Sequence, residues 1–418
     1  MEQLKDCGGT DNMLTIIIIL LSVFVLLFFA FKMGDVFSPW MLTSGVWLAI
    51  MLLSLNDIGY LDPISNQLYY CVLLWVPTLV IFSVATYYAF PSKVYSFKED
   101  NTELNRGVFY FFFFIALVCT PFFVYKVYKI VMMFGTEDLF SNIRSLAVLQ
   151  SKTGDSAGIL KYVNTINKAL YVVALWNIKK LGKGVFIIVL LINLMYAASI
   201  MEKGFLFFIF FSTLFVLYEK QKVSLKTLLL WCVIIIVFFY GFNLLRANVD
   251  SDDYGTFGRF FSMYILSPSV AFSKTQEVLN DQLGTRTFTF IYSFANKIFG
   301  SDYTIMPNLQ DFVWVPIPTN VYTVFQPFFQ DFGYKGVALF ASVYGIITGL
   351  TYRLARNGGQ IARCVYAYVI YILILQFFQE VFLVGISDLF QYIIIFCLMT
   401  QKKFKISFDG FFKSRSKA

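Results

Sequence analysis

Long apolar runs separated by short polar stretches follow one another along most of this chain, between residues 13 and 399. About twenty consecutive apolar residues cross the hydrocarbon core of a bilayer as a helix. The pattern therefore predicts an all-α polytopic integral membrane protein with roughly eleven membrane-spanning helices. The expected spans are, in order, residues 13–31, 36–55, 68–90, 108–128, 160–176, 185–200, 205–218, 225–245, 336–352, 362–383 and 387–399.

The first span occupies the position of a secretory signal, but its apolar run is too long and no small-residue cleavage site follows Phe31. We therefore expect it to be retained. The fifth span carries Asn164, Asn167 and Lys168 among its apolar residues. Because polar groups at membrane depth need partners, this span could be a re-entrant or cavity-lining helix.

One long polar segment, residues 246–335, interrupts the series of apolar spans. Within it, residues 260–279 and 286–299 place apolar side chains at helical spacing, the first with an interruption at Ser267-Pro268. Residues 321–332 form a third helix-like run. The segment is too rich in phenylalanine and tyrosine for a disordered region. We expect a long, folded, largely helical loop packed on one face of the membrane.

The composition supports an embedded chain, since hydrophobic residues make up 58% and charged residues 14% of it. A soluble domain could not keep such long uncharged stretches in solution. We expect a single membrane domain over residues 1–418 with no soluble appendage. The net charge of +8 comes from residues spread through loops, with no basic patch interleaved with aromatics, so nucleic acid is not an expected partner.

The basic residues of the short loops predict the orientation, because such loops stay in the cytoplasm when they are rich in lysine and arginine. With eleven spans, the basic loops and the tail from Gln401 fall on one side. Residues 246–335 then lie on the outer side, together with residues 135–158. The residues that set this orientation are Lys93, Lys98, Arg106, Lys179, Lys180, Lys183, Lys220, Lys222, Lys226, Arg353, Arg356, Arg363, Lys402, Lys403 and Lys405.

The cysteines and the absence of histidine exclude several kinds of chemistry. Six cysteines are scattered, mostly within spans, and form no Cys-x-x-Cys pair, so neither a disulfide framework nor a thiolate metal site is indicated. The chain contains no histidine, which excludes Ser-His-Asp, HExxH and other histidine-based mechanisms. We expect no metal and no cofactor.

Four arginines are expected on the outer side: Arg144, Arg246, Arg259 and Arg286. Arg246 follows directly after the eighth span, where a cation can simply anchor the helix at the interface. Alternatively, the arginines could form a clamp for an anionic group such as a diphosphate, since the planar guanidinium binds phosphate oxygens in pairs. Both interpretations stay open at this point.

Carboxylates occur at three places where they could take part in chemistry. The aspartates at positions 250, 252 and 253 could hold a divalent cation, although such a cluster is more often a solvated turn. Asp311 and Asp331 could serve as general base for a hydroxyl, or could cap the helices that follow them. Glu380, near the outer end of the tenth span, could face a cavity or form a hydrogen bond between packed helices.

The chain resembles the Wzy-type oligosaccharide repeat-unit polymerases of O-antigen and capsule synthesis. The likeness covers roughly the C-terminal 40% of the chain in motif-like matches, and the N-terminal half only in its pattern of spans. The matching segments are Leu245-Arg246, Tyr264-Ile265-Leu266, Gly284-Thr285-Arg286-Thr287-Phe288, Pro318-Thr319-Asn320-Val321-Tyr322-Thr323, Asp331-Phe332-Gly333 and Gly336.

This resemblance implies a multi-pass glycosyltransferase of the bacterial inner membrane that acts on the periplasmic face. Its implied substrates are glycans linked to undecaprenyl diphosphate, and its implied partners are membrane lipids and a chain-length regulator protein. Related ligases use a histidine near the acceptor, and this chain has none. A carboxylate would have to replace that base, or no base would be needed.

The expected catalytic residues are Arg246, Arg259, Asp311, Asp331 and Glu380. The expected substrate-binding residues are Arg144, Arg286, Tyr254, Tyr264, Asn320 and Tyr322, with Tyr292 and Trp314 as further aromatic surface for sugar rings. A flippase or transporter of lipid-linked oligosaccharides, an O-antigen ligase-like enzyme and a structural partner of the same assembly stay open as alternatives. The sugars, the linkage and the stereochemical outcome are not determined by the sequence.

Overall fold

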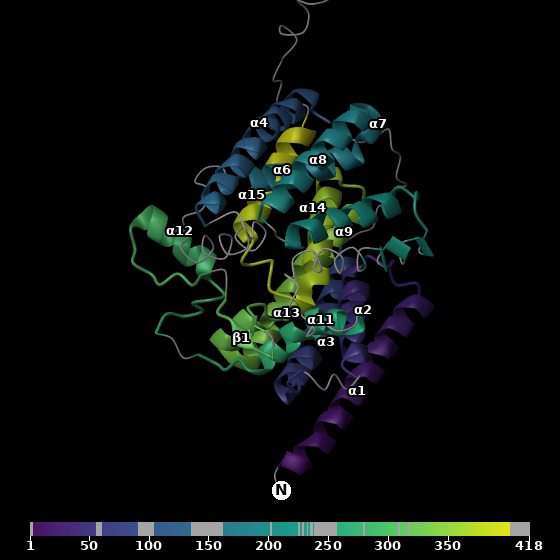
Figure 1. Ribbon diagram of the computed structural model, residues 1–418. Coiled ribbons are helices and arrows are strands. Elements are labelled where there is room, and N and C mark those ends of the chain that lie inside the picture. The colour runs from purple at the N-terminus through teal and green to yellow at the C-terminus, as the bar shows by residue number, and fades with distance from the viewer. Residues whose placement is uncertain are drawn as a thin grey trace, which may run out of the picture. The chain divides into compact units, whose positions relative to one another are not determined.

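The computed structural model describes most of the chain and shows it as a set of helices (Figure 1). The described residues are 3–55, 61–90, 104–134, 162–200, 203–224, 226–227, 230–231, 233–234, 237, 257–278, 281–307, 310–316 and 318–401. Within this part, the only strands are β1 (Val313–Trp314) and β2 (Pro318–Thr319), which pair antiparallel with Val313 opposite Thr319. The described part therefore confirms an all-α architecture.

The helices follow the expected spans closely in several places. They are α1 (Gln3–Ala30), α2 (Pro39–Leu53), α3 (Asn66–Ala89), α4 (Arg106–Val131), η2 (Met132–Phe134), α6 (Val163–Trp176), α7 (Ile178–Leu181), α8 (Lys183–Ile200), α9 (Lys203–Glu219), α11 (Phe257–Ser273), α12 (Thr289–Phe299), α13 (Gln326–Arg356), α14 (Gln360–Ile374), η5 (Leu375–Phe377) and α15 (Ile386–Thr400).

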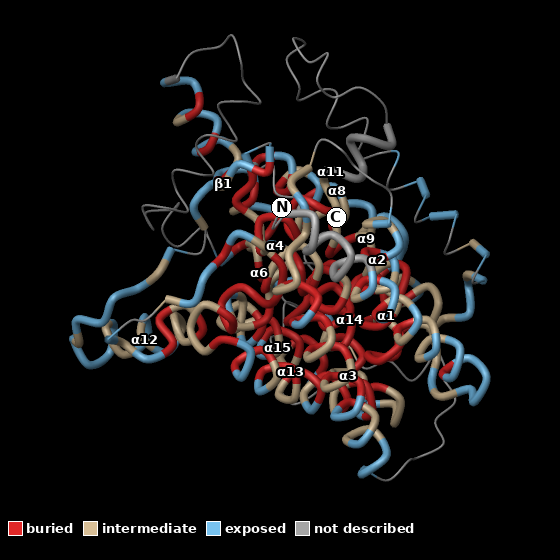
Figure 2. Tube along the Cα trace, turned by 90° about the horizontal axis from the view of Figure 1, so that it is seen from below, coloured by how far each residue is buried: buried red, intermediate tan, exposed pale blue. Residues whose placement is uncertain are grey.

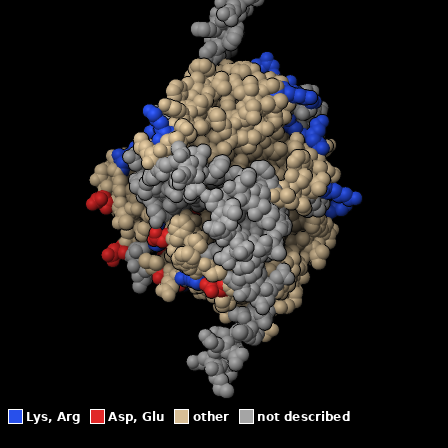
Figure 3. Space-filling view, in the orientation of Figure 1, with Lys and Arg blue, Asp and Glu red and all other residues tan. Residues whose placement is uncertain are grey.

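Five of the described segments are long and apolar enough to cross a membrane, and they correspond to the expected first, third, fourth, ninth and tenth spans. Shorter apolar helices correspond to the second, sixth, seventh and eleventh. Much of the surface in Figure 3 carries neither acidic nor basic side chains, as contact with lipid requires. The chain is thus a membrane protein. The count of eleven spans stays a prediction, because most of residues 225–245 lie outside the described part.

The chain divides into two compact units, each built from segments that are separate in the sequence. The first comprises Met1–Ser92, Lys226–Arg353 and Val369–Ile386, and the second Lys93–Leu225, Leu354–Tyr368 and Ser387–Ala418. The expectation of a single membrane domain stays a prediction.

Helices α3 and α13 of the first unit pack closely because α13 presents two glycines at that surface. Gly345 and Gly349 stand four residues apart, the spacing that lets membrane helices approach backbone to backbone. A Cβ atom at Gly345 would lie 2.7 Å from the carbonyl oxygen of Leu79, and one at Gly349 would meet the carbonyl oxygen of Ser83. Larger side chains would force the two helices apart.

Gln376 organises the polar centre of the first unit. Its side-chain oxygen accepts hydrogen bonds from the indole N–H groups of Trp47 at 3.3 Å and Trp75 at 2.8 Å, and its amide donates to Thr43 at 3.1 Å. The backbone N–H of Val324 donates to the Gln376 carbonyl at 2.8 Å. These contacts fix the chain segment that leads into α13.

Basic residues of the predicted cytoplasmic loops bind carbonyl groups near the ends of helices. In the first unit, Arg353 donates to the Phe90 carbonyl through Nε at 2.9 Å. In the second, Lys220 donates to the carbonyls of Leu175 and Trp176, both at 2.9 Å. Cations are favourable at helix C-termini, whose last carbonyls lack partners within the helix. These side chains therefore stabilise helix ends.

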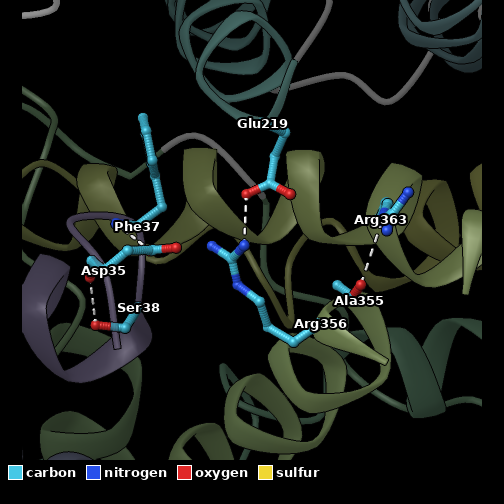
Figure 4. A network of polar contacts seen from close by, with 7 residues as sticks. All are labelled: Asp35, Phe37, Ser38, Glu219, Ala355, Arg356 and Arg363. Carbon is cyan, nitrogen blue, oxygen red and sulfur yellow. Dashed lines mark hydrogen bonds and ion pairs between the residues drawn. The ribbon is translucent and has the colours of Figure 1, made fainter. Parts of the chain in front are cut away.

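A second charged contact of the second unit lies at the end of α9. Arg356 Nη1 lies 2.8 Å from Glu219 Oε1, and the two side chains face each other in Figure 4. In the same figure Arg363 points toward Ala355, whose carbonyl accepts its Nε at 3.3 Å. Pairing lowers the cost of holding charge in a poorly hydrated place.

The described part of the predicted outer loop contains helices whose boundaries differ from the expected ones. The first expected helix is α11, which starts at Phe257, continues through Pro268 and ends at Ser273. The second, α12, begins at Thr289 and not at residue 286. The third expected run and the ninth span form one helix, α13, which continues through a kink at Gly333 (φ 61°, ψ −153°).

Candidate functional site

Several of the expected site residues lie outside the described part of the chain. These are Arg144, Arg246, Tyr254 and the aspartates at positions 250, 252 and 253. The backbone of Arg259 is in α11, but its side chain is outside that part as well, and Tyr264 is half-buried on the same helix. The remaining expected residues all belong to the first unit.

Asp331 connects the second turn of α13 to the segment that contains Arg286. Its Oδ2 atom accepts the backbone N–H of Thr287 at 2.7 Å and that of Arg286 at 3.1 Å. The Thr287 hydroxyl donates to the Pro327 carbonyl at 3.3 Å, one turn earlier on α13. A carboxylate that accepts two backbone donors forms strong, charge-assisted hydrogen bonds. Asp331 thereby fixes the position from which the Arg286 side chain emerges.

Arg286 holds two guanidinium nitrogens, Nε and Nη1, that are buried and contact no acceptor among the described residues. Leaving a buried donor without an acceptor costs about 1–3 kcal/mol, and more for a charged group. An anionic group with two oxygens, such as a phosphate or a carboxylate, matches the guanidinium fork. Arg286 is the one expected arginine whose side chain the structure describes, and the nitrogens that the described residues leave unpaired suit an anionic ligand.

The kink in α13 depends on Gly333, which has a φ of 61°. Residues with a side chain rarely adopt this backbone conformation. A Cβ atom here would also lie 2.6 Å from the Glu277 carboxylate. Three residues before the kink, the Gln330 carbonyl accepts the Val278 N–H at 2.8 Å. The glycine therefore allows the chain after α11 to pack directly against α13.

Two polar side chains precede α13 and lack hydrogen-bond partners among the described residues. Asn320 is 8% exposed and its Nδ2 atom has no acceptor, and Thr323 is fully buried with its hydroxyl unpaired. Buried polar groups in proteins are nearly always hydrogen-bonded. Amide and hydroxyl groups are suited to the hydroxyls of a sugar. Both residues belong to the motif-like segment 318–323.

The side chain of Tyr322 contacts the main chain of Asp311. The Tyr322 hydroxyl donates to the Asp311 carbonyl at 3.0 Å, while the side chain of Asp311 is exposed. Burial raises the pKa of Tyr322 above its ordinary value, and the nearby Asp311 charge adds to the effect. Tyr322 therefore stays protonated and acts as a hydrogen-bond donor.

The short β1–β2 pair is attached to the rest of the first unit by Lys274. Its ammonium lies 2.5 Å from an Asp62 oxygen and donates to the Trp314 carbonyl at 2.6 Å. Trp314 is 66% exposed as a residue, even though its carbonyl is bound by Lys274. An exposed aromatic ring on a fixed backbone provides a flat apolar surface, of the kind on which a sugar ring can stack.

Glu380 is buried, and both of its oxygens accept hydrogen bonds. Oε1 accepts the Tyr344 hydroxyl and the Leu383 N–H, the latter at 2.8 Å, and Oε2 accepts the Val384 N–H at 2.9 Å. The helix expected over residues 362–383 ends earlier, with η5 at Phe377. Glu380 thus stabilises the turn that leads toward α15 and connects it to α13, as the helix-packing interpretation expects.

The second unit contains a buried lysine that the expected site does not include. Lys168 lies in α6, and its ammonium faces three aromatic rings at 5.4–5.8 Å from their centroids, those of Phe205, Phe208 and Tyr368. Attraction to ring faces offsets part of the cost of burying a cation. The neighbouring Asn167 donates to the Thr120 hydroxyl at 3.2 Å. The expectation that this helix lines a cavity stays a prediction.

Sequence reasoning did not assign a role to Thr287 or Thr323, although both lie in the motif-like segments. Thr287 contacts Asp331 and Pro327, about forty residues away in the sequence, and Thr323 is fully buried with its hydroxyl unpaired in the described part of the chain. No local pattern reveals either property. Among the described residues, no group of three or more Cys, Asp or Glu side chains could hold a metal ion.

Comparison with known proteins gives one informative match. The chain is 31% identical over 155 residues to the protein of Escherichia coli (strain K12) named "Putative O-antigen polymerase". This chain is similar to a named polymerase. The match covers 36% of this chain and 37% of that protein, so it spans well under half of either. No protein-family model and no solved structure matches the chain.

Proposed function

We propose that this chain is a membrane glycosyltransferase that joins oligosaccharide repeat units carried on undecaprenyl diphosphate into O-antigen or capsular polysaccharide. The similarity to a protein named as an O-antigen polymerase supports the class of reaction. The apolar helices support a lipid-linked substrate, because the carrier's tail stays in the bilayer. The inner membrane as location, the periplasmic face as reaction side and a chain-length regulator as partner belong to the same proposal.

The observation that carries the proposal is the pair of buried guanidinium nitrogens of Arg286 that the described residues leave unpaired. Two of its buried nitrogens lack an acceptor among the described residues, and its backbone is fixed by Asp331. A lipid diphosphate supplies anionic oxygens at the spacing of the guanidinium fork. The negative charge on the departing diphosphate grows in the transition state, so an arginine placed there lowers the barrier.

The reaction is a substitution at the anomeric carbon of the growing glycan. An acceptor hydroxyl of the incoming repeat unit forms the new carbon–oxygen bond, and the bond to the diphosphate breaks with its electron pair on the leaving group. The hydroxyl proton passes to a base or to the diphosphate itself. Among the expected carboxylates, Asp311 is exposed, whereas Asp331 and Glu380 accept backbone N–H groups. In this proposal Asp331 is a positioning residue for Arg286.

In this proposal, the segment that leads into α13 recognises the sugar. Asn320 and Thr323 offer unpaired polar atoms for sugar hydroxyls, and Trp314 offers an exposed ring. The segment lies directly before the first turns of α13, where Asp331 binds the backbone of Arg286 and Thr287 and Pro327 binds the Thr287 hydroxyl. Glycan and diphosphate groups of one substrate could therefore bind along neighbouring parts of the first unit.

A strain that lacks the gene tests the proposal through its surface glycans. We expect single repeat units on a gel in place of a polymer ladder. The wild-type gene should restore the ladder, Arg286→Gln should not, and Arg286→Lys should restore it only in part because a lysine lacks the fork. Lys335→Gln, which removes one exposed positive charge from the same unit, is the matched control and should restore the ladder. Loss of every repeat unit in the deletion strain would favour a flippase.

A further inference from the structure

Helix α12 has one polar and one apolar side. At 100° per residue, its large apolar residues fall on one half of the circumference and its polar residues on the other. The apolar half contains Phe290, Ile291, Phe294, Ile298 and Phe299, and the polar half contains Thr289, Tyr292, Ser293, Asn296 and Lys297.

The polar half of α12 binds the protein's own chain. The Thr289 hydroxyl donates to the Arg286 carbonyl at 2.9 Å, and the Tyr292 hydroxyl donates to the carbonyl of Leu283. The Asn296 amide donates to the Tyr303 carbonyl at 2.8 Å and accepts the Tyr303 N–H at 2.9 Å. These contacts hold the helix by its polar side.

The apolar half of α12 faces outward. None of its residues is buried, and Ile298 and Phe299 are 58% and 75% exposed. Figures 1 and 2 both show α12 apart from the other helices of the first unit, and Figure 2 colours it as exposed and intermediate. A surface helix of a water-soluble protein has the opposite arrangement, with its apolar side inward. Burying large apolar side chains away from water is favourable, which favours a nonpolar environment around this side.

We propose that α12 lies along the membrane interface with its apolar half in the lipid. The helix is joined to a membrane-spanning segment, because Phe288 packs against Phe332 and Phe340 of α13 at centroid distances of 6.0 and 6.1 Å. Leu339, next to Phe340, is itself exposed on the outside of α13, as a lipid-facing residue would be. In this proposal α12 therefore starts beside a helix that is long and apolar enough to cross the membrane.

The charge of α12 fits the same position. Lys297 is exposed and lies at the border between the two halves, beside Phe290 on the helix circumference. A lysine at such a border can keep its stem along the apolar side and its ammonium among lipid phosphates. Short amphipathic helices with a basic residue at the border and bulky apolar residues opposite are typical of monotopic membrane binding.

This position has a consequence for Arg286, which rests on the function proposed above. Arg286 lies three residues before α12, and its carbonyl accepts the Thr289 hydroxyl at the start of that helix. A helix at the interface therefore holds Arg286 at the depth of the lipid head groups. A diphosphate attached to a membrane lipid reaches this depth by diffusing in the plane of the bilayer, so the carrier need not leave the membrane to be bound.

Depth-dependent quenching tests the proposal without any glycan. A fluorescent amino acid is incorporated at Ile298, or at the exposed polar position Ser293 as the matched control, in the full-length chain in nanodiscs of phosphatidylethanolamine and phosphatidylglycerol. We expect lipids brominated on their acyl chains to quench the probe at Ile298 and not at Ser293. Aqueous iodide should quench the probe at Ser293 and spare the one at Ile298.

Equal quenching by iodide at both positions would overturn the proposal, because the apolar side would then face water. Protection of the Ile298 probe from both quenchers would also overturn it, and would indicate that a protein surface, such as a second copy of this chain, covers the helix. Because the measurement contains no glycan and no polymerisation step, its outcome is independent of whether the proposed reaction is correct.

Discussion

The carboxylate of Asp331 accepts the backbone N–H of Thr287 at 2.7 Å, across forty-four residues of sequence. The same carboxylate accepts the N–H of Arg286 at 3.1 Å, so two consecutive residues are fixed to α13 by one side chain. A carboxylate that takes up backbone donors cannot rotate freely toward a substrate. In the proposed function, Asp331 therefore contributes by placing Arg286, the arginine that precedes α12.

Asp331→Asn should keep part of the activity, and Asp331→Ala should lose nearly all of it. The amide oxygen still accepts the Thr287 N–H, whereas alanine leaves two backbone donors unpaired, and each hydrogen bond to a charged acceptor is worth about 1.5–3 kcal/mol. Polymer yield measures the loss of activity in both variants, and thermal unfolding measures the loss of stability. Asp302→Asn, at an exposed position, is the control.

The pH dependence of the Asp331 variants separates placement from proton transfer. As a positioning residue, Asp331→Asn should leave the shape of the pH–rate profile unchanged. A general base contributes about a hundred- to ten-thousand-fold in rate, and the amide cannot replace it. An Asn variant as inactive as the Ala variant, with the acidic limb of the profile lost, would assign the base to Asp331.

Replacing Glu380 should affect stability and activity together. Its oxygens accept two backbone N–H groups and the Tyr344 hydroxyl, so Glu380→Gln exchanges a charged acceptor for a weaker one. A double-mutant cycle with Tyr344→Phe should give a coupling free energy of about 0.5–3 kcal/mol in thermal unfolding, because the residues are in contact. Independent, additive effects would show that the contact does not stabilise the protein.

Gly349→Leu should destabilise the first unit much more than Gly45→Leu. A Cβ atom at Gly349 meets the Ser83 carbonyl of α3, whereas one at Gly45, inside α2, has no atom within 4 Å. Overpacking typically costs about 1–3 kcal/mol. Thermal unfolding in detergent compares the two variants. Similar melting temperatures for both would mean that α3 and α13 do not approach at this glycine.

The sequence was informative about elements with a strong local signal. The apolar runs located α3, α4 and α13, because a span of this length needs no tertiary context to be recognised. The boundaries of α13 were less predictable. A glycine in a helix-like run is ordinarily a break, yet Gly333 allows a kink after which the helix continues. Whether a helix ends or bends at such a residue depends on what packs against it. In this protein the Glu277 side chain packs against Gly333.

The candidate site was predictable in part. The motif-like segments singled out Arg286, Asn320 and Asp331, and the structure places all three in the first unit. The role of Asp331 was open between base and cap, since its partners lie at residues 286 and 287 and are contacted only after folding. Which side of α12 faces outward could also not be predicted from the sequence. Tyrosine is both apolar and polar, so the pattern alone did not decide which half of the helix contains Tyr292.

The orientation of the loop gives a further prediction. The basic short loops predict that residues 246–335 lie on the periplasmic side and the C-terminal tail in the cytoplasm. Phosphatase fusions are active only outside the cytoplasm, so a fusion after Gly300 should be active and one after Ala418 should be inactive. The reverse pattern would require a different number of spans and would put Arg286 on the cytoplasmic side.

Polymerisation by the purified full-length chain tests the central proposal most directly. In nanodiscs supplied with repeat units on undecaprenyl diphosphate, the wild-type chain should produce a ladder of longer lipid-linked glycans. Arg286→Gln should leave single units, and Lys335→Gln should produce the ladder. A wild-type chain that leaves every unit single, yet moves the same lipid across a vesicle bilayer, would contradict the proposal.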